Sequence, residues 1–393
     1  MKHILFVDDE INVLNGLKRM LRGERMSWEM MFVESGEEAL ELCSRFSFDV
    51  VVSDIRMPGM DGATLLSLIR ERYPATSRIA LSGYLDDELL TKALPVVHRY
   101  IMKPCQQREL QSAIANLLSL CEILKTKELR QVVGAIGVLP SPPALVERLI
   151  KVINEPDTST IKIAELIEKD VSMSAQILHL ANSDFFNVAI QSTSIMQAID
   201  HLGLNTIRHL VLAAELFRAY VPNQIISASW IETVQLHAQH TAKIASHFFQ
   251  RSCLYEEIFT ASLLHDIGIT ILASSMPEQY SRCIEQAHAD LDKVYLEEEK
   301  VFGVSHAEVG AYLLGVWGLP AAVVQAVSNH HNPMRHTHEG GEVVLAVYIS
   351  DLLSRSLGAS DAMSVLGEQD RINIEQLGLR SEYERMHGLM LAE

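Results

Sequence analysis

The chain has 393 residues, enough for two or three domains, and its 48% hydrophobic and 21% charged content is ordinary for a globular protein. The formal net charge of −17 shows no basic excess of the kind that duplex-binding proteins usually carry, so we expect no nucleic-acid partner. The five cysteines are widely spaced and form no CxxC pair, which is typical of reduced cysteines in the cytoplasm. Charged residues follow the first apolar run at once, and no apolar stretch reaches the ~18 residues of a membrane span. We therefore expect a cytoplasmic chain without a membrane partner.

Residues 1–122 alternate short apolar runs with helical patterns. The apolar runs HILFV, EMMFV, DVVVS, RIALS and HRYIM predict strands. The segments INVLNGLKRML, EEALELCSRF, GATLLSLIRERY and DDELLTKAL lie between them and predict helices. Five strands alternating with helices predict an α/β fold with a doubly wound, five-stranded parallel sheet. Ligands of such sheets bind at the carboxyl ends of the strands.

The segment 106–133 has the apolar spacing of one long amphipathic helix, which would join the first domain to a linker helix over residues 123–138. Such a helix could mediate a homodimer or pack on its own sheet, and the sequence leaves both open. The segment GVLPSPP at 137–143 ends the pattern. Helical periods separated by turn residues follow, so residues 139–393 are predicted to form an all-α domain.

Polar side chains in the first domain stand where the predicted strands end. Asp8 and Asp9 follow the first strand, Asp54 ends the third, Ser82 ends the fourth, and Lys103 follows the fifth. These side chains should meet at one edge of the sheet. Adjacent carboxylates suit Mg²⁺, which also binds phosphate oxygens. Asp54 would be the nucleophile for a phosphoryl group, and Lys103 and Ser82 would contact its oxygens.

With Met57-Pro58-Gly59 after the aspartate and Pro104 after the lysine, residues 1–122 resemble the receiver domain of response regulators. The resemblance implies that Asp54 is phosphorylated by a sensor histidine kinase or a phosphotransfer protein. It implies Mg²⁺ ligands at Asp8, Asp9, Asp54 and the backbone carbonyl of Arg56, and switch residues at Ser82, Tyr100 and Lys103. A phosphoryl group would add about −1.5 to −2 charges, draw Ser82 toward it and allow Tyr100 to turn inward.

A second set of polar residues lies on apolar helical patterns of the C-terminal half. Burying such groups unpaired is costly, so a metal or a hydrogen-bonded core cluster is needed to explain them. Histidine and carboxylate suit Zn, Fe, Mn or Ni. His237 and His247 share a helix with His240 but match no ligand pattern. The candidate ligands are His240, His265, Asp266, His306, His330, His331 and Asp351.

The order of these residues resembles the HD superfamily of metal-dependent phosphohydrolases, which implies one or two metals bridged by Asp266. Residues 134–331 more closely resemble the HD-related output domain, HDOD, through phrases such as LIEKDVSMSAQILHLANSDFF and HAEVGAYLLGVWGLPAAVVQAVSNHH. HDOD domains are signalling modules that often lack a complete ligand set, whereas this chain keeps one. It departs from the HD-GYP phosphodiesterases, because Ile269 replaces their lysine and no GYP follows the paired histidines.

Taken together, the motifs predict a two-component response regulator. Phosphorylation at Asp54 would control an HDOD output domain that binds metal and acts on a downstream signalling protein. The alternative is a metal-dependent phosphohydrolase or phosphodiesterase, with cyclic-di-GMP as the first substrate to test and with no catalytic residue assigned. A transcription factor is disfavoured, because the C-terminal half shows no basic recognition helix.

Overall fold

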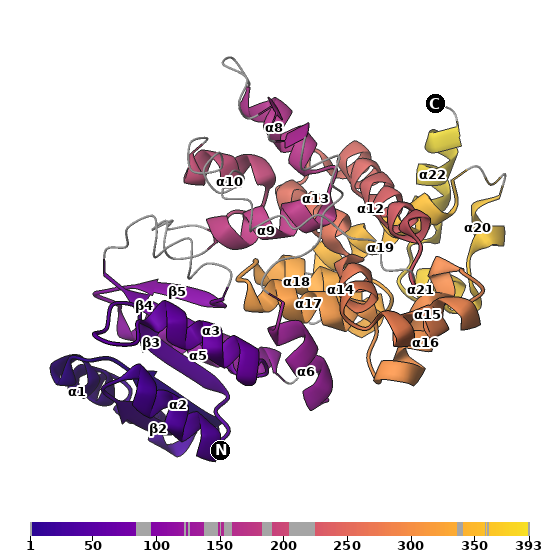
Figure 1. The fold of residues 1–393 in the computed structure, drawn as a ribbon. Helices are drawn as coiled ribbons and strands as arrows, with labels where there is room; N and C mark the ends of the chain where they lie inside the picture. The colour runs from indigo at the N-terminus through magenta and orange to yellow at the C-terminus, as the bar shows by residue number, and fades with distance from the viewer. Residues whose placement is uncertain are drawn as a thin grey trace.

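The fold consists of an N-terminal α/β unit and a larger helical unit packed against it (Figure 1). The computed structural model describes residues 2–83, 96–121, 123–124, 126–136, 148–149, 151–152, 159–182, 191–203, 225–335, 341–357, 359 and 361–391. The predicted helix DDELLTKAL and the segment GVLPSPP lie outside the described residues.

The N-terminal unit contains the predicted five-stranded parallel sheet, in the order β2-β1-β3-β4-β5. Its strands are β1 (Lys2–Val7), β2 (Trp28–Val33), β3 (Val50–Asp54), β4 (Ser77–Ser82) and β5 (Arg99–Met102). Its helical segments are α1 (Ile11–Met20), η1 (Arg22–Met26), α2 (Gly36–Arg45), α3 (Gly62–Arg72) and α5 (Gln107–Leu120). The doubly wound α/β fold predicted for this half is therefore confirmed.

The register of the strands brings their carboxyl ends to one edge of the sheet. Val7 pairs with Ser53 and Asp54 pairs with Leu81, so the end of β1 lies beside the end of β3. Ser82 pairs with Met102, which places the end of β4 beside the end of β5. The five residues of β3 are all buried, as expected for the central strand of a sheet that is covered on both faces.

The prediction of one long helix over 106–133 is wrong. The structure divides this segment into α5, which ends at Leu120, and α6 (Lys127–Gly134). The Thr126 hydroxyl accepts a hydrogen bond from the Leu129 amide at 3.3 Å, and this cap starts the new helix. The end of α6 packs on the sheet, where the buried guanidinium of Arg78 donates to the Gly134 carbonyl at 2.7 Å. The segment after α5 thus lies against its own domain.

The remaining described elements are helical, which confirms the all-α prediction for this half. The first helices are α8 (Thr160–Ile167), α9 (Val171–Ala181), α10 (Ile195–Leu202), α12 (Ala228–Phe249), α13 (Tyr255–Leu264) and α14 (Ile267–Ser275). Next come α15 (Pro277–Gln286), α16 (Leu291–Phe302), α17 (His306–Val316), α18 (Ala321–Asn329), η3 (Pro333–Arg335) and α19 (Gly341–Arg355). The last are α20 (Ala362–Val365), α21 (Glu368–Gln376) and α22 (Arg380–Leu391).

One helical stretch of the described chain, Tyr255–Ser275, is long and apolar enough to cross a membrane by length and composition. Its most apolar window is 83% buried inside the protein, which is how a core helix behaves. The stretch consists of α13 and α14, with His265 and Asp266 at the break between them. The break precedes Gly268, which lies inside α14.

Candidate phosphorylation and metal sites

The carboxyl edge of the sheet holds a compact charged cluster. Asp54 is 6% exposed, and its Oδ2 accepts a hydrogen bond from the Arg56 amide at 2.7 Å. Lys103 donates through Nζ to Asp8 Oδ2 at 2.6 Å and to Asp54 Oδ1. Burial raises the pKa of Asp54, and the bond to Lys103 opposes the rise only in part. Burial alone would lower the pKa of Lys103, but its bonds to Asp54 and Asp8 outweigh this and raise it, so Lys103 stays a cation.

The other residues predicted for this site, Asp9, Ser82 and Tyr100, differ in how deeply they are buried. Asp9 is exposed at the rim, beside buried Asp8. The Ser82 hydroxyl is buried and has no hydrogen-bond partner among the described residues, so it is available to a new acceptor. Tyr100 is 1% exposed. Its ring therefore already lies inside the protein, and an inward turn is not needed to bury it.

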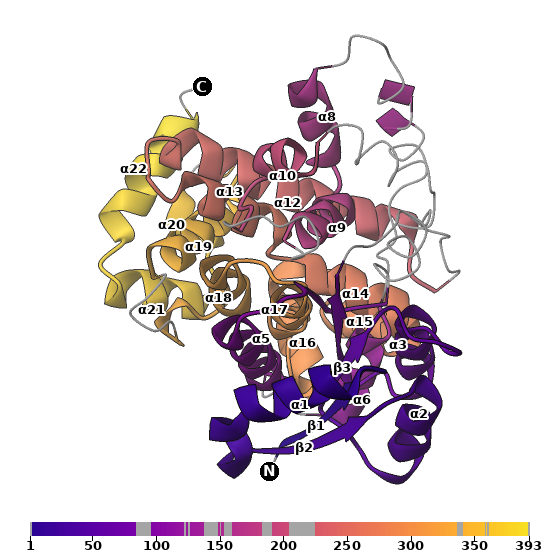
Figure 2. The same ribbon diagram turned by 90° about the vertical axis from the view of Figure 1, so that its left-hand side faces the viewer.

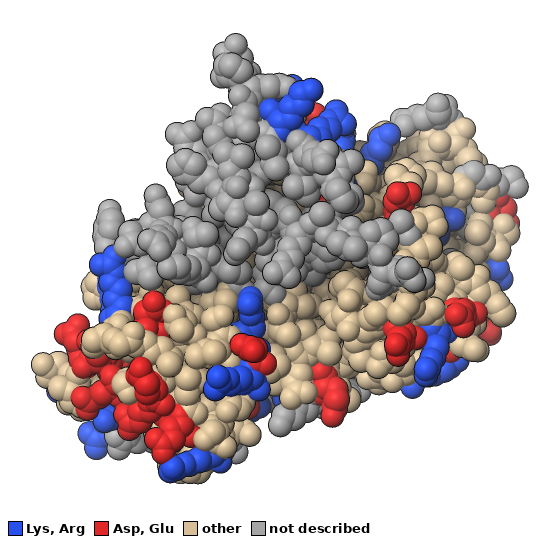
Figure 3. All heavy atoms as spheres, in the orientation of Figure 1, with Lys and Arg blue, Asp and Glu red and all other residues tan. Residues whose placement is uncertain are grey.

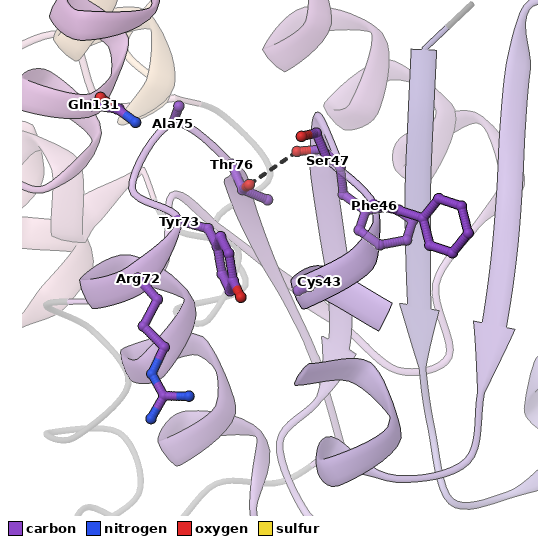
Figure 4. Close-up of a pocket in the computed structure, with 9 residues that line it drawn as sticks. Cys43, Phe46, Ser47, Arg72, Tyr73, Ala75, Thr76 and Gln131 are labelled. Atoms are coloured by element: carbon purple, nitrogen blue, oxygen red, sulfur yellow. Dashed lines mark hydrogen bonds between the residues drawn. The ribbon is translucent and has the colours of Figure 1, made fainter. Parts of the chain in front are cut away.

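Two features of the N-terminal unit lie outside the charged cluster: an acidic surface and a cavity at the opposite end of the sheet. Acidic side chains gather over the N-terminal unit in the view of Figure 3. A cavity of about 100 Å³ lies where β3 and β4 begin, at the end of the sheet away from Asp54 (Figure 4). There the Thr76 hydroxyl donates to the Phe48 carbonyl at 2.9 Å, and burial raises the pKa of Cys43 to about 11. This cavity is separate from the charged cluster.

In the helical unit, the Asp266 carboxylate lies between two groups of possible metal ligands. Its Oδ1 is 3.1 Å from His306 Nε2 and 3.6 Å from His330 Nε2. Its Oδ2 is 3.3 Å from His265 Nε2. The ligand atoms within each group lie within 4.8 Å of one another: Asp266, His306, His330 and His331 in one group, and His237, His265 and Asp351 in the other.

The structure brings His237, and not the predicted ligand His240, to the second group of possible ligands. His237 Nε2 is 2.9 Å from Asp351 Oδ1, whereas His240 is exposed and lines a surface groove with Lys243. The pattern of apolar residues in α12 already distinguishes His237 from His240. His237 falls on the stripe of buried residues that includes Val234, Ala238 and Thr241, whereas His240 follows exposed Leu236 by four residues.

Neighbouring acceptors orient three of the imidazoles. His265 Nδ1 lies 2.7 Å from the Ser262 carbonyl, and His330 Nδ1 lies 2.7 Å from the Val327 carbonyl. A carbonyl can only accept, so each Nδ1 carries a proton, and each Nε2 faces Asp266 and offers a lone pair when the imidazole is neutral. His306 Nδ1 is held in the same way, 2.7 Å from Glu298 Oε2. The Nε2 atoms of His265 and His330 are buried and have no hydrogen-bond partner among the described residues. A bound cation would satisfy these lone pairs.

The charges of the cluster also favour cations. Burial would raise the pKa of Asp266, but His265, His306 and His330 outweigh it and hold that pKa well below its ordinary value. The pKa of Asp351 is likewise lowered against the effect of burial, chiefly by Arg355, whose Nη2 is 2.8 Å from Asp351 Oδ2. Both carboxylates are therefore ionised at neutral pH.

Close helix packing brings Asp266 and His306 together. A Cβ on Gly268 would lie 2.0 Å from the His306 carbonyl oxygen, so α14 can approach α17 only through a glycine. The start of α17 is fixed by Glu308 Oε2, which accepts from the Ser305 amide at 2.8 Å in a capping box. This cap places His306 in the first helical turn, facing the end of α13.

The cluster is closed on most sides. Exposure is 1% at His265, 5% at Asp266, 1% at His306, 0% at His330 and 2% at Asp351. The Tyr295 ring stacks on His331 with centroids 4.1 Å apart and covers it. Structural metal sites are closed in this way, whereas catalytic sites keep an open position for water or substrate.

Family comparisons agree with this division of the chain. The response regulator receiver domain matches residues 4–115, and the HDOD domain matches residues 139–333. The chain is a response regulator with an N-terminal receiver domain and a C-terminal HDOD domain. Both matched domains belong to the response regulators of signal transduction.

Individual relatives cover parts of the chain. An uncharacterized protein of Treponema pallidum is 25% identical over 238 residues, which is 59% of this chain and 45% of that protein. The uncharacterized transcriptional regulatory protein YesN of Bacillus subtilis is 29% identical over 121 residues, 30% of this chain and 33% of YesN. The chain thus spans less than half the length of these two curated relatives. The crystal structure of the MmoQ response regulator of Methylococcus capsulatus is 22% identical, with a TM-score of 0.49, over 60% of this chain and 97% of that chain.

The buried ion pair beside the cluster yields a stability prediction. In protein freed of metal by dialysis against a chelator, Arg355→Met should lower the free energy of unfolding by about 3 kcal/mol, because Asp351 keeps its charge but loses its cation. Urea unfolding followed by circular dichroism measures this. Arg380→Met is the control: Arg380 pairs with Glu375 and Glu384 on the surface, where solvent screens the charges, so its loss should leave the free energy of unfolding nearly unchanged. Equal losses for the two variants would contradict the role of Arg355.

Proposed function

We propose that phosphorylation of Asp54 controls an HDOD domain that binds one or two transition metals and passes the signal to a downstream protein in the cytoplasm. The observation that carries the metal assignment is the Asp266 carboxylate, whose two oxygens face separate groups of buried imidazoles. The closure of the cluster favours a signalling module over an enzyme. The net charge of −17 gives no support to a nucleic-acid partner.

The receiver chemistry is phosphoryl transfer to a carboxylate. One oxygen of Asp54 attacks the phosphorus, and the donor leaves as a kinase imidazole or, with a small-molecule donor, as acetate. Mg²⁺, when bound, neutralises charge on the phosphoryl oxygens, and Asp8, Asp9, Asp54 and the Arg56 carbonyl would hold it. Lys103, which pairs with Asp54 and Asp8, would transfer its hydrogen bonds to the phosphoryl group, and the Ser82 hydroxyl would donate to it.

In the HDOD domain, the two groups around Asp266 would hold cations as separate half-sites. The first half-site would use His306, His330 and His331, and the second would use His237, His265 and Asp351. His331 Nε2 lies 2.9 Å from His306 Nε2, and two nitrogens at that distance need a shared proton or a shared cation. Imidazole with carboxylate suits Fe, Mn, Zn or Ni.

Phosphorylation at the proposed acceptor is directly testable. Acetyl phosphate with Mg²⁺ should label the wild-type chain, and Asp54→Ala should abolish the label because the attacking carboxylate is gone. Phosphate-affinity electrophoresis measures the shift. Asp61→Asn is the control, since Asp61 caps α3 through Thr64 and asparagine retains that cap. Undiminished labelling of Asp54→Ala would refute the assignment.

Metal binding can be tested by elemental analysis of the purified protein. The wild type should contain at least one equivalent of a transition metal. His306→Ala and His237→Ala should each lower the content severalfold, because each removes a buried ligand, whereas exposed His240→Ala should retain the wild-type content. A wild type that stays metal-free after incubation with Mn²⁺, Fe²⁺ or Zn²⁺ would show that the histidines form a hydrogen-bonded core.

The alternative function is hydrolysis of a phosphodiester. A carboxylate between two ligand groups is the arrangement that a two-metal hydrolase needs, and this favours an enzyme. Ile269 in place of the HD-GYP lysine and the buried ligands weigh against it. We expect metal-loaded wild type to leave cyclic-di-GMP and a chromogenic phosphodiester intact. Turnover by the wild type that is lost in both His265→Ala and Asp266→Ala would establish the enzyme instead.

A further inference from the structure

Helix α17 joins the two candidate sites of the molecule. Its first residue, His306, lies in the histidine cluster, 3.1 Å from Asp266. Its last turn lies against the receiver, where α17 contacts both α5 and α6. Figure 2 shows α17 next to α5. An α-helix rises about 1.5 Å per residue, so a helix of this length extends about 16 Å, and its burial along almost its whole length makes it stiff.

Receiver side chains pack directly on the carboxyl end of α17. Arg99 donates through Nη2 to the Gly315 carbonyl at 3.4 Å. A Cβ on Gly318 would lie 2.0 Å from Arg99 Nη1, and one on Gly315 would lie 2.5 Å from Leu120 Cδ2. Arg99 and Leu120 of the receiver can therefore pack this closely only because residues 315 and 318 are glycines. A guanidinium at this position also opposes the negative end of the helix dipole.

The HDOD domain holds the neighbouring carbonyls of the same turn. His179 stacks on Trp317 and donates through Nδ1 to the Trp317 carbonyl at 3.1 Å, while Gln191 donates to the Gly318 carbonyl at 2.9 Å. Burial lowers the pKa of His179 to about 4, so this imidazole is neutral. Among these groups, Arg99 is the cation at the end of α17, and it comes from the other domain.

The strand that carries Arg99 leads to the phosphorylation site. Arg99 begins β5, a strand of four residues, and Lys103 follows its end. Lys103 is bonded to Asp8 and Asp54. A strand of this length spans about 13 Å. A movement of Lys103 toward a new partner would therefore be passed along β5 to Arg99. The route from Asp54 to His306 thus runs through β5 and α17.

We propose that α17 couples the phosphorylation state of Asp54 to the metal affinity of the histidine cluster. When Lys103 turns to a phosphoryl group, β5 repositions Arg99 on the Gly315–Gly318 turn, α17 shifts, and His306 moves relative to Asp266. Coupling between binding sites is reciprocal, so bound metal changes the receiver's affinity for a phosphoryl mimic by the same factor. The metal readout rests on the proposed metal site, whereas the movement of α17 rests only on the proposed phosphorylation of Asp54.

The test uses the full chain, with beryllofluoride and saturating Mg²⁺ as the phosphoryl mimic. Zn²⁺ affinity is measured by competition with a chelating dye, and hydrogen exchange is followed over residues 306–316. In the wild type, beryllofluoride should change Zn²⁺ affinity about fivefold or more and change exchange in α17. Arg99→Gln should reduce the affinity change to less than twofold while leaving beryllofluoride binding intact. Exposed Arg19→Gln is the matched control and should behave like the wild type.

Leu120→Ala provides a second break in the same contact if Arg99→Gln folds poorly. Zn²⁺ binding that ignores beryllofluoride, together with unchanged exchange in α17, would overturn the coupling while leaving the metal site in place. Full coupling in both Arg99→Gln and Leu120→Ala would also overturn it. If the chain binds no Zn²⁺ at all, the metal assignment fails, and exchange over residues 306–316 alone decides the coupling: a response lost in Arg99→Gln supports it, and no response in the wild type refutes it.

Discussion

The position of one carboxylate, Asp266, organises the helical half of the protein. Asp266 lies at the break between α13 and α14, so its two oxygens can face different groups of side chains. This requires α14 and α17 to touch, which they do through Gly268 and the His306 carbonyl. A buried anion is stable only beside cations or donors. The imidazoles around Asp266 therefore either carry protons or share metal ions, and in both cases Nε2 faces the carboxylate.

Much of the fold followed from patterns that local physics controls. Strands buried on both faces read as apolar runs, and their carboxyl ends meet at one edge, so Asp8, Asp54 and Lys103 could be brought together from the sequence alone. The prediction of one continuous helix over 106–133 was wrong because it missed a helix cap and a distant contact. Apolar spacing persists through the segment, but Thr126 caps a new helix, and the carbonyl at its end is bound by Arg78, a residue far away in the chain.

The histidine cluster was predictable in composition and less so in detail. Most of its members could be chosen by order along the chain, but His237 and His240 share one helix, and order cannot say which faces the core. The buried stripe through Val234, Ala238 and Thr241 decides for His237. The roles of Glu298, Tyr295 and Arg355 depend on tertiary contacts, and no spacing rule places them beside His306, His331 and Asp351.

A closed cluster at one end of a buried helix gives metal ions a role other than catalysis. Pulling α17 away from α14 would separate His306 from Asp266, so metal binding and the position of α17 depend on each other. The other end of α17 rests on Arg99 and Leu120 of the receiver, where glycines leave no room for adjustment by side chains. Any change in that contact must therefore be taken up by movement of the helix or of the receiver. In an enzyme, a movement of α17 in response to the receiver would disturb the geometry of the metal ligands. In a signalling module, the same movement would connect the phosphorylation state to the output surface.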